Sequence, residues 1–229
     1  MNKHDQIKAF VKEELEIFGG PLYMPETVLE TDMEKTSVSS DVKTLSEFNN
    51  VIENCMNCPL GATRTNFVFG AGNPDADDMF VGEAPGEKED LEGLPFVGRS
   101  GKLLTDILKA IDLTRDDVYI ANILKCRPPK NRDPNKAEIE ECEPYLLKQI
   151  EMIKPKLLVA LGRISATTLL RTKDSLTSMR GQVFDYHGTD MVVTYHPAAL
   201  LRNPNWKRPA WEDFKKIREM YLEKRGEQA

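Results

Sequence analysis

The four cysteines of this 229-residue chain constrain its fold more than any other feature. Two form the close pair Cys55-x2-Cys58, and the other two, Cys126 and Cys142, are separated by fifteen residues. Four thiolates gathered at one point can hold a tetrahedral zinc ion or a cubane iron–sulfur cluster. The wide second gap is unusual for a zinc ribbon and favours a cluster, but the spacing leaves both metals open.

A disulfide framework is the alternative use of four cysteines. The chain begins with a charged segment, residues 1–16, and not with the apolar core of a signal peptide. No segment is apolar over the length that a membrane helix needs. We therefore expect a cytoplasmic protein with no membrane contact, in a reducing compartment where disulfides are disfavoured.

The charge of the chain limits how it could bind nucleic acid. A net charge of −6 excludes a uniformly basic surface but allows a local basic face. Basic residues gather in two stretches. The simpler interpretation is that these stretches are solvated loops, and the alternative is that they form a binding surface. These residues are Lys125, Arg127, Lys130 and Arg132 in the first stretch and Arg202, Lys207 and Arg208 in the second.

Short apolar strands alternate with amphipathic helices from residue 45 onwards. Strands are expected over residues 79–81, 118–124, 156–161 and 191–195, and helices over 45–52, 100–111, 136–153, 163–170 and 209–224. This alternation predicts an α/β fold with a parallel sheet between two layers of helices. Residues 1–44, an amphipathic helix followed by an irregular arm, are expected to form an N-terminal extension to a single domain over 45–229.

Ligands of such sheets bind beyond the carboxyl ends of the strands. Glu83, Asn122 and His196 each follow a different predicted strand, so a carboxylate, an amide and an imidazole should meet at one edge. Each also has a structural interpretation, as part of a tight turn, as a partner for local backbone groups or as a structural histidine. Phe96 lies in a glycine-rich loop and could be a core residue or a ring held at the site.

Four sequence motifs, interleaved with the two cysteine pairs, make the chain similar to the type 4 (iron–sulfur) uracil-DNA glycosylases. In their order along the chain, the motifs are GEAPGEKED, LPFVGRSGKLL, NILKCRPPKNRDP and YHPAALLR. The resemblance implies a three-layer α/β/α sandwich around a central four-stranded parallel sheet. It also implies a [4Fe–4S] cluster, for which we expect a structural role because hydrolysis requires no electron. Its ligands would be Cys55, Cys58, Cys126 and Cys142.

The activity implied by the resemblance is hydrolysis of the bond between uracil and deoxyribose, in single- or double-stranded DNA, by a monomer. The target base is flipped out of the helix into a pocket. The residues of the matching motifs then take the roles that the family gives them. Asn122 reads the polar edge of uracil, Phe96 stacks on it, Gly82 lines the pocket, His196 stabilises the departing anion and Glu83 orients water.

Two positions differ from those of other glycosylases of the superfamily. Ala84 stands where other glycosylases of the superfamily have an aspartate, and Gly86 where relatives place a tyrosine that excludes the methyl group of thymine. We expect Glu89 to replace this steric wall and Asn131 to help shape the site. The two departures leave open a glycosylase that acts on hypoxanthine or xanthine.

DNA contacts are expected from loops on the same edge of the sheet. Leu200 would fill the gap that the flipped nucleotide leaves. The phosphates would be contacted by Arg202, Lys125, Arg127, Lys130 and Arg132. Besides a glycosylase for another base, the sequence leaves two further functions open: a zinc-stabilised nucleic-acid-binding module without catalysis, and an electron-transfer protein.

Overall fold

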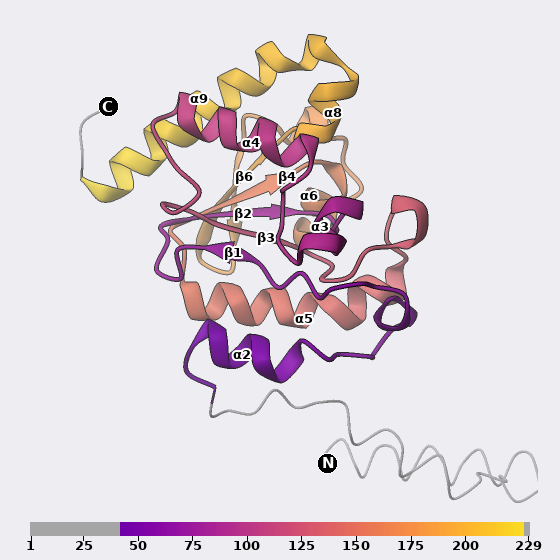
Figure 1. The fold of residues 1–229 in the computed structure, drawn as a ribbon. Helices are drawn as coiled ribbons and strands as arrows, with labels where there is room; N and C mark the ends of the chain where they lie inside the picture. The colour runs from indigo at the N-terminus through magenta and orange to yellow at the C-terminus, as the bar shows by residue number, and fades with distance from the viewer. Residues whose placement is uncertain (1–41, 227–229) are drawn as a thin grey trace, which may run out of the picture. The chain divides into compact units, whose positions relative to one another are not determined.

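The computed structural model describes residues 42–226. These residues form an α/β unit built on one six-stranded sheet with the strand order β1-β3-β2-β4-β6-β5 (Figure 1). The amphipathic helix expected over residues 1–19 lies outside the described part of the chain, as do most residues of the expected arm. None of the helices within the described part combines the length and the apolar character needed to span a bilayer.

Four parallel strands form the centre of the sheet. In spatial order they are β3 (Tyr119–Asn122), β2 (Asp78–Gly82), β4 (Leu157–Leu161) and β6 (Thr189–Thr194). All three pairings between them are parallel, which confirms the predicted four-stranded parallel sheet. Every residue of β2, β3 and β4 is buried, as expected for parallel strands that are covered on both faces.

Two antiparallel edge strands were not predicted from the sequence. β1 (Ala71–Gly72) pairs with β3, and β5 (Val183–Tyr186) pairs with β6. His187 and Gly188 join β5 to β6, and their positive φ angles of 52° and 85° suit a two-residue hairpin turn. The sequence gives little sign of β5 because this strand is short and mostly exposed.

Helices cover both faces of the sheet, which confirms the three-layer α/β/α arrangement (Figure 1). One layer contains α4 (Arg99–Ala110), α8 (Pro197–Arg202) and α9 (Lys207–Arg225), and the other contains α2 (Leu45–Ile52) and α5 (Lys136–Ile153). Shorter elements connect them: α3 (Glu87–Glu92), α6 (Arg163–Leu170), α7 (Leu176–Met179), and the 3₁₀ turns η2 (Pro59–Ala62), η3 (Pro129–Asn131) and η4 (Pro204–Trp206).

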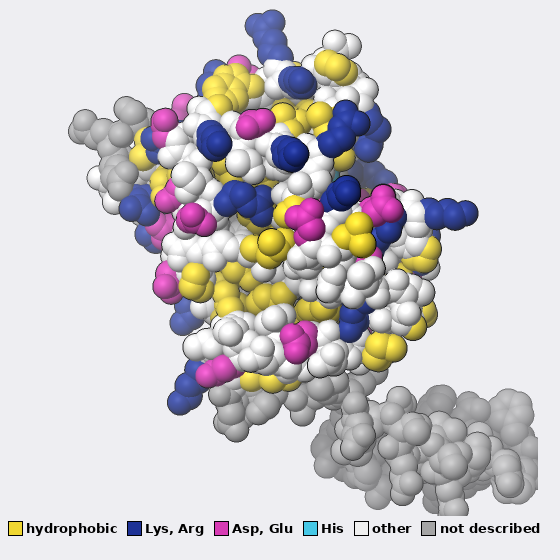
Figure 2. Space-filling model, viewed as in Figure 1, with side chains coloured by type: hydrophobic (Ala, Val, Ile, Leu, Met, Phe, Trp, Pro, Cys, Tyr) yellow, Lys and Arg dark blue, Asp and Glu magenta, His cyan; other side chains and the backbone are white. Residues whose placement is uncertain are grey.

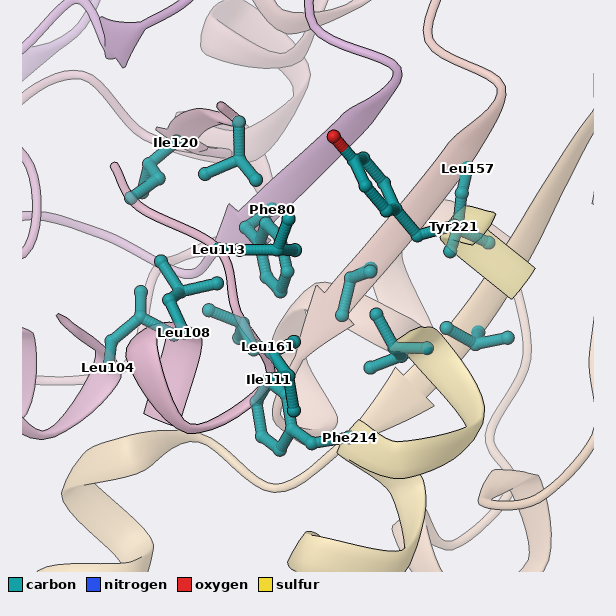
Figure 3. Close-up of a cluster of buried hydrophobic side chains, with 14 of the residues drawn as sticks. Phe80, Leu104, Leu108, Ile111, Leu113, Ile120, Leu157, Leu161, Phe214 and Tyr221 are labelled. Carbon is teal, nitrogen blue, oxygen red and sulfur yellow. The ribbon is translucent and has the colours of Figure 1, made fainter. Parts of the chain in front are cut away.

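The main hydrophobic core lies between the sheet and the helices α4 and α9 (Figure 3). Phe80 of β2 stacks on Phe214 of α9 with the ring centroids 6.5 Å apart. Leu104 and Leu108 lie one turn apart on the apolar face of α4 and are fully buried in the same cluster. Truncation of a phenylalanine to alanine in such a core costs about 3–5 kcal/mol. This packing fixes the strands whose carboxyl ends carry the site.

Candidate active site

An open cleft of about 1060 Å³ lies beyond the carboxyl ends of the parallel strands. Glu83 follows β2, Asn122 ends β3, and His196 comes soon after β6. All three side chains line this cleft together with Phe96, which precedes α4. The structure therefore brings the predicted carboxylate, amide, imidazole and aromatic ring to one cavity, as the sheet topology leads us to expect.

Gly82 lets two of these side chains approach the end of β2. A Cβ atom at Gly82 would lie 2.7 Å and 2.8 Å from the Cζ and Cε2 atoms of Phe96, and closer still to Oδ1 of Asn122. Any larger residue would therefore push the ring and the amide apart. Gly82, which was expected to line the pocket, is buried against these two groups and is not itself a lining residue of the cleft.

The side chain of Asn122 is 2% exposed, and its Oδ1 atom has no hydrogen-bond partner among residues 42–226. A buried acceptor without a donor costs about 1–3 kcal/mol, and native structures rarely retain one without a reason. The atom is thus available to an N–H group of a ligand that enters the cleft.

The ring of Phe96 is held by an unusual backbone. Its φ angle of 54° is left-handed, which is uncommon for a residue with a bulky side chain. Arg115 donates to the carbonyl oxygen of Phe96 at 3.0 Å and to that of Pro95 at 2.7 Å. The ring centroid of Phe96 lies 5.4 Å from that of His196, with 30° between the planes. The ring is therefore fixed beside the imidazole.

His196 is a neutral imidazole at pH 7. Burial, together with the positive charge of Arg202, lowers its pKa to about 4. Its Nδ1 atom accepts a hydrogen bond of 3.1 Å from the backbone N–H of Ala198, so the ring proton resides on Nε2. Gly162 makes room for the histidine, because a Cβ there would lie 2.9 Å from the Cβ of His196. The site thus contains a neutral donor that keeps its proton.

Glu83 is the titrating group of the cleft. Burial, together with the nearby charge of Asp133, raises the pKa of its carboxyl group to about 7. The positive charges of Arg163 and Arg202 lower the pKa of Glu83 and so partly offset this rise. The side chains of Arg163 and Asp133 form an ion pair of 3.6 Å, so the carboxylate sits among mixed charges. Near neutral pH it can exchange a proton with a bound water.

Glu89 supports the loop that carries Phe96. Its Oε1 atom accepts hydrogen bonds from the backbone N–H groups of Val97 at 3.0 Å and Gly98 at 2.8 Å. Its Oε2 atom lies 2.7 Å from the point that a Cβ at Gly86 would occupy. The carboxylate therefore fills the space beside Gly86, which is where the steric wall was expected.

Asn131 also lines the cleft, as expected for a residue that helps shape the site. Its Oδ1 atom accepts a hydrogen bond of 2.7 Å from Nε of Arg127. Its φ angle of 54° is left-handed, a conformation that asparagine tolerates better than most residues do. The amide thus holds one of the expected phosphate-binding side chains at the edge of the cleft.

Two of the expected DNA contacts are wrong. Lys125 is fully buried, and its Nζ donates to the carbonyl oxygen of Asn122 and to Oε1 of Gln149. It therefore cannot reach a phosphate. Leu200 is 2% exposed, because it faces the interior from α8. Its neighbour Leu201 is 37% exposed and lines the cleft, so the exposed apolar side chain of this helix is the next one along.

The other expected phosphate contacts are accessible. Lys130, Arg132 and Arg202 are exposed, and Arg127 is half-buried. Arg132 is also paired with Glu138, at 2.9 Å and 2.6 Å between two pairs of atoms, which partly offsets its charge.

The four cysteines are free thiols, of which Cys126 and Cys142 are buried. Burial raises the pKa of Cys126, although the hydrogen bond and charge of Arg64 lower it in part. Burial also raises the pKa of Cys142 to about 12, so an unligated Cys142 is a neutral thiol. Among residues 42–226, no three or more His, Cys, Asp or Glu side chains are arranged as a metal-binding group.

The surroundings of the sulfur atoms nevertheless fit thiolate ligands. The backbone N–H of Lys125 donates to Sγ of Cys142 at 3.2 Å, and the hydroxyl of Tyr145 donates to Sγ of Cys55 at 3.2 Å. The Arg64 guanidinium donates to Sγ of Cys126 at 3.4 Å. Hydrogen bonds of this kind orient metal-bound thiolates and stabilise their negative charge.

Some residues that build the site carry little signal in the sequence. Arg115 precedes β3 and does not follow the carboxyl end of any strand. Only its two hydrogen bonds to the Phe96 loop show that it supports the site. Trp206 lines the cleft from η4, although the terminal segment resembles any amphipathic helix with an aromatic residue at its start. In both cases the tertiary fold brings the side chain to the site.

Residues 69–215 match the family described as the uracil DNA glycosylase superfamily. The chain is 50% identical over 187 residues to a type-4 uracil-DNA glycosylase of Sulfurisphaera tokodaii, a similarity that covers 78% of this chain and 85% of that protein. Type-4 uracil-DNA glycosylases of Archaeoglobus fulgidus and Thermotoga maritima are 44% and 45% identical to it. These matches cover 78% and 76% of this chain and 94% and 93% of the two relatives.

Proposed function

The chain belongs to the uracil DNA glycosylase superfamily and, within it, to the type-4 uracil-DNA glycosylases, and we propose on this basis that it removes uracil from DNA. It is a DNA-repair enzyme that hydrolyses the N-glycosidic bond of deoxyuridine, releases uracil and leaves an abasic site. The resemblance found in the sequence is confirmed by the comparisons.

The unpartnered Oδ1 atom of Asn122 is the observation that carries this function. Uracil offers an N–H donor at position 3 and a carbonyl acceptor at position 4, and a primary amide matches both. Cytosine reverses this pattern and would leave buried polar groups of the site without partners. Such a mismatch costs several kcal/mol, which corresponds to roughly a thousandfold discrimination. The ring of Phe96 would stack on the base without reading its identity.

His196 stabilises the leaving group. When the bond between C1′ and N1 breaks, its electron pair stays with uracil and the charge collects on O2. The Nε2–H of the neutral imidazole donates to this oxygen and does not need to lose its proton. A fixed donor at a developing oxyanion typically accelerates a reaction by about 10²–10³-fold.

Glu83 completes the hydrolysis. In its ionised form it offsets the positive charge on the sugar and orients a water whose oxygen bonds to C1′. The carboxylate accepts the proton of this water, and the uracil anion later takes up a proton from solvent. The raised pKa of Glu83 makes it a base near neutral pH, although Ala84 takes the place of the aspartate of other glycosylases of the superfamily.

A [4Fe–4S] cluster is the second part of the proposal. Its ligands would be Cys55, Cys58, Cys126 and Cys142, whose sulfur atoms receive the hydrogen bonds described above. When bound, the cluster would supply a cross-link between the segment after α2, the loop after β3 and α5. A thiolate-bound cluster also suits the reducing, cytoplasmic setting expected from the sequence.

Chemical analysis tests this assignment. The purified protein should absorb visible light and contain about four iron and four sulfide per chain. A colourless protein that contains one zinc per chain after anaerobic preparation would overturn it.

DNA would bind across the cleft, as single strands or as a duplex, to a monomer of the protein. Lys and Arg side chains spread over the part of the surface formed by α4, α8 and α9 (Figure 2). The exposed Arg202 stands at the end of α8 beside the cleft. A local basic face of this kind supports phosphate binding by a protein whose net charge is −6.

A base-release assay tests the proposed activity. An oligonucleotide with one uracil is incubated with the protein without added divalent metal, and abasic sites are then cleaved with alkali. We expect cleavage of single- and double-stranded uracil substrates and none of a thymine control. Faster release of hypoxanthine or xanthine than of uracil would favour the alternative glycosylase. Binding of DNA without release of any base would leave only a nucleic-acid-binding module.

A further inference from the structure

Trp206 places an exposed aromatic ring at the edge of the cleft. The side chain is 39% exposed and lines the cleft together with the exposed Leu201. None of the roles in the proposed reaction uses it. Tryptophan, with a large apolar ring and one polar N–H, is enriched at binding interfaces.

The ring of Trp206 is held in a fixed position. It stacks on the ring of Tyr195 with the centroids 5.0 Å apart and 16° between the planes. The Arg180 guanidinium lies over the same tyrosine, 4.4 Å from its centroid, and forms two hydrogen bonds of 2.7 Å and 2.9 Å with Asp213. A ring that is already immobile loses little conformational entropy when a ligand stacks on it.

The backbone around Trp206 is fixed as well. The N–H of Trp206 donates to the carbonyl oxygen of Asn203 at 3.1 Å, and the Asn203 side chain accepts from the N–H of Asn205 at 3.2 Å. These bonds set the 3₁₀ turn η4, from which α9 begins.

Positive charges flank the ring on both sides in the sequence. Arg202, Lys207 and Arg208 are exposed, and neither Lys207 nor Arg208 forms an ion pair within the described range. Cations beside an exposed aromatic ring match a nucleic acid strand, which presents phosphates and flat bases at regular intervals. An apolar protein partner would leave these charges without counter-ions.

We propose that Trp206 stacks on a nucleobase of the bound DNA, next to the nucleotide that enters the cleft, while the flanking cations contact its phosphates. The inference rests on the proposed function, because it takes the cleft as the site of the flipped uracil. It assigns to Trp206 a role in holding the strand, separate from base recognition by Asn122 and from the chemistry at His196. The contact should be stronger with single-stranded DNA, whose bases have free faces.

The two tryptophans of the chain allow a direct test. Trp211 is 38% exposed and does not line the cleft, so it is matched to Trp206 in exposure but not in position. Trp211→Phe leaves Trp206 as the only indole, and Trp206→Phe leaves Trp211. The probe is a single-stranded oligonucleotide with a tetrahydrofuran abasic analogue, which binds without being hydrolysed. We expect it to quench most of the emission of Trp206 and to leave that of Trp211 unchanged.

Affinity measurements complete the test. Trp206→Ala should weaken binding of the same oligonucleotide by about tenfold or more, as expected for one lost base stack. Trp211→Ala should not change the affinity, and Trp206→Phe should restore much of it because a smaller ring remains. Thermal unfolding of each variant shows whether the fold is intact.

The outcomes separate this inference from the proposed function. Unquenched Trp206 emission at saturating DNA, in a protein that still releases uracil, would overturn the stacking role alone. Quenched emission in a protein that releases no uracil would overturn the glycosylase activity and leave the stacking role in place. Equal quenching of both tryptophans would also contradict a specific role for Trp206.

Discussion

The Nζ atom of Lys125 donates a hydrogen bond of 2.9 Å to the backbone carbonyl oxygen of Asn122. The same Nζ donates to Oε1 of Gln149 at 2.6 Å, and the backbone N–H of Lys125 donates to Sγ of Cys142 at 3.2 Å. Burial lowers the pKa of Lys125 to about 8, and the nearby Cys142 partly offsets this effect. One buried residue thus joins the cysteine loop to the strand end that carries the amide of the site.

Replacement of Lys125 by methionine should affect both sides of this connection. The carbonyl oxygen of Asn122 and the Oε1 of Gln149 would lose their shared donor, at a cost of about 1.5–3 kcal/mol in the free energy of unfolding. Because the Asn122 backbone would then be less fixed, we expect a raised KM for uracil-DNA together with a lower melting temperature. Both are measured beside Lys109→Met, a change at an exposed lysine of α4. Equal KM values for the two variants would rule out a positioning role.

Asn122→Asp should change which base is released. An ionised aspartate offers only acceptors, so the 4-carbonyl of uracil would face a second acceptor while the 4-amino group of cytosine would gain a partner. We expect uracil release to fall by about a hundredfold, and the ratio of uracil to cytosine release to fall with it. Single-turnover rates on both substrates measure this ratio. Asn73→Asp, which keeps the acceptor for the N–H of Asp75, is the control that should leave it unchanged.

His196→Ala should slow the chemical step and spare DNA binding. The loss of the Nε2–H donor removes a contact that strengthens as charge develops on uracil, so the single-turnover rate should fall by about 10²–10³-fold. The affinity for an abasic analogue should change little. His187→Asn serves as the control, since asparagine tolerates the left-handed φ of this turn residue. A full single-turnover rate in His196→Ala would refute the leaving-group role.

The rate of uracil release should rise with pH through about pH 7. Only the ionised form of Glu83 can orient and deprotonate water, and burial raises its pKa to about 7. His196 does not change its protonation state in this range, because its pKa is lowered to about 4, so it adds no second step to the pH–rate profile. Asp133→Asn removes a neighbouring negative charge and should move the rise to lower pH. Glu83→Gln should be slow and independent of pH, and a wild-type rate that is flat between about pH 5 and pH 8 would contradict the assignment.

Much of the fold follows from the sequence because the parallel strands are continuous apolar runs. Residues 79–81 lie in β2, and residues 157–161 of the strand expected over 156–161 form β4. Both strands are buried along their whole length, as their apolar sequences indicate. The edge strand β5 was missed because it has only four residues, and the exposed Val183 and Asp185 leave it without a continuous buried run. Edge strands depend on pairing with a neighbour more than on their own composition.

The candidate site was predicted in part, because the sequence indicates where strands end but not where each nearby side chain points. The position after a strand end is set by topology, so the sequence could bring Glu83, Asn122 and His196 together. The direction of a single side chain in a short helix or loop is set by packing. The sequence therefore did not distinguish Leu200, which is buried, from Leu201, which is exposed. It also placed Lys125 on the surface because buried lysines are rare.

Asp78 carries a buried carboxyl group at the opposite end of β2 from the cleft. Neither of its oxygen atoms has a hydrogen-bond partner among residues 42–226. Burial and the nearby charge of Asp77 raise its pKa from 3.8 to about 7, against the opposing effect of Lys224 and Arg225. Between these two pKa values the folded protein binds a proton that the unfolded chain releases.

The stability of the wild type should therefore fall as the pH rises from about 4 to about 7, by at most on the order of 4 kcal/mol from this group. Asp78→Asn removes the titration. Its advantage over the wild type in free energy of unfolding should grow through this range and stay constant above it. Urea unfolding at several pH values measures the difference, and Asp75→Asn, at an exposed position nearby, should show no such growth. A difference between Asp78→Asn and the wild type that does not change with pH would mean that Asp78 is ionised in the folded protein.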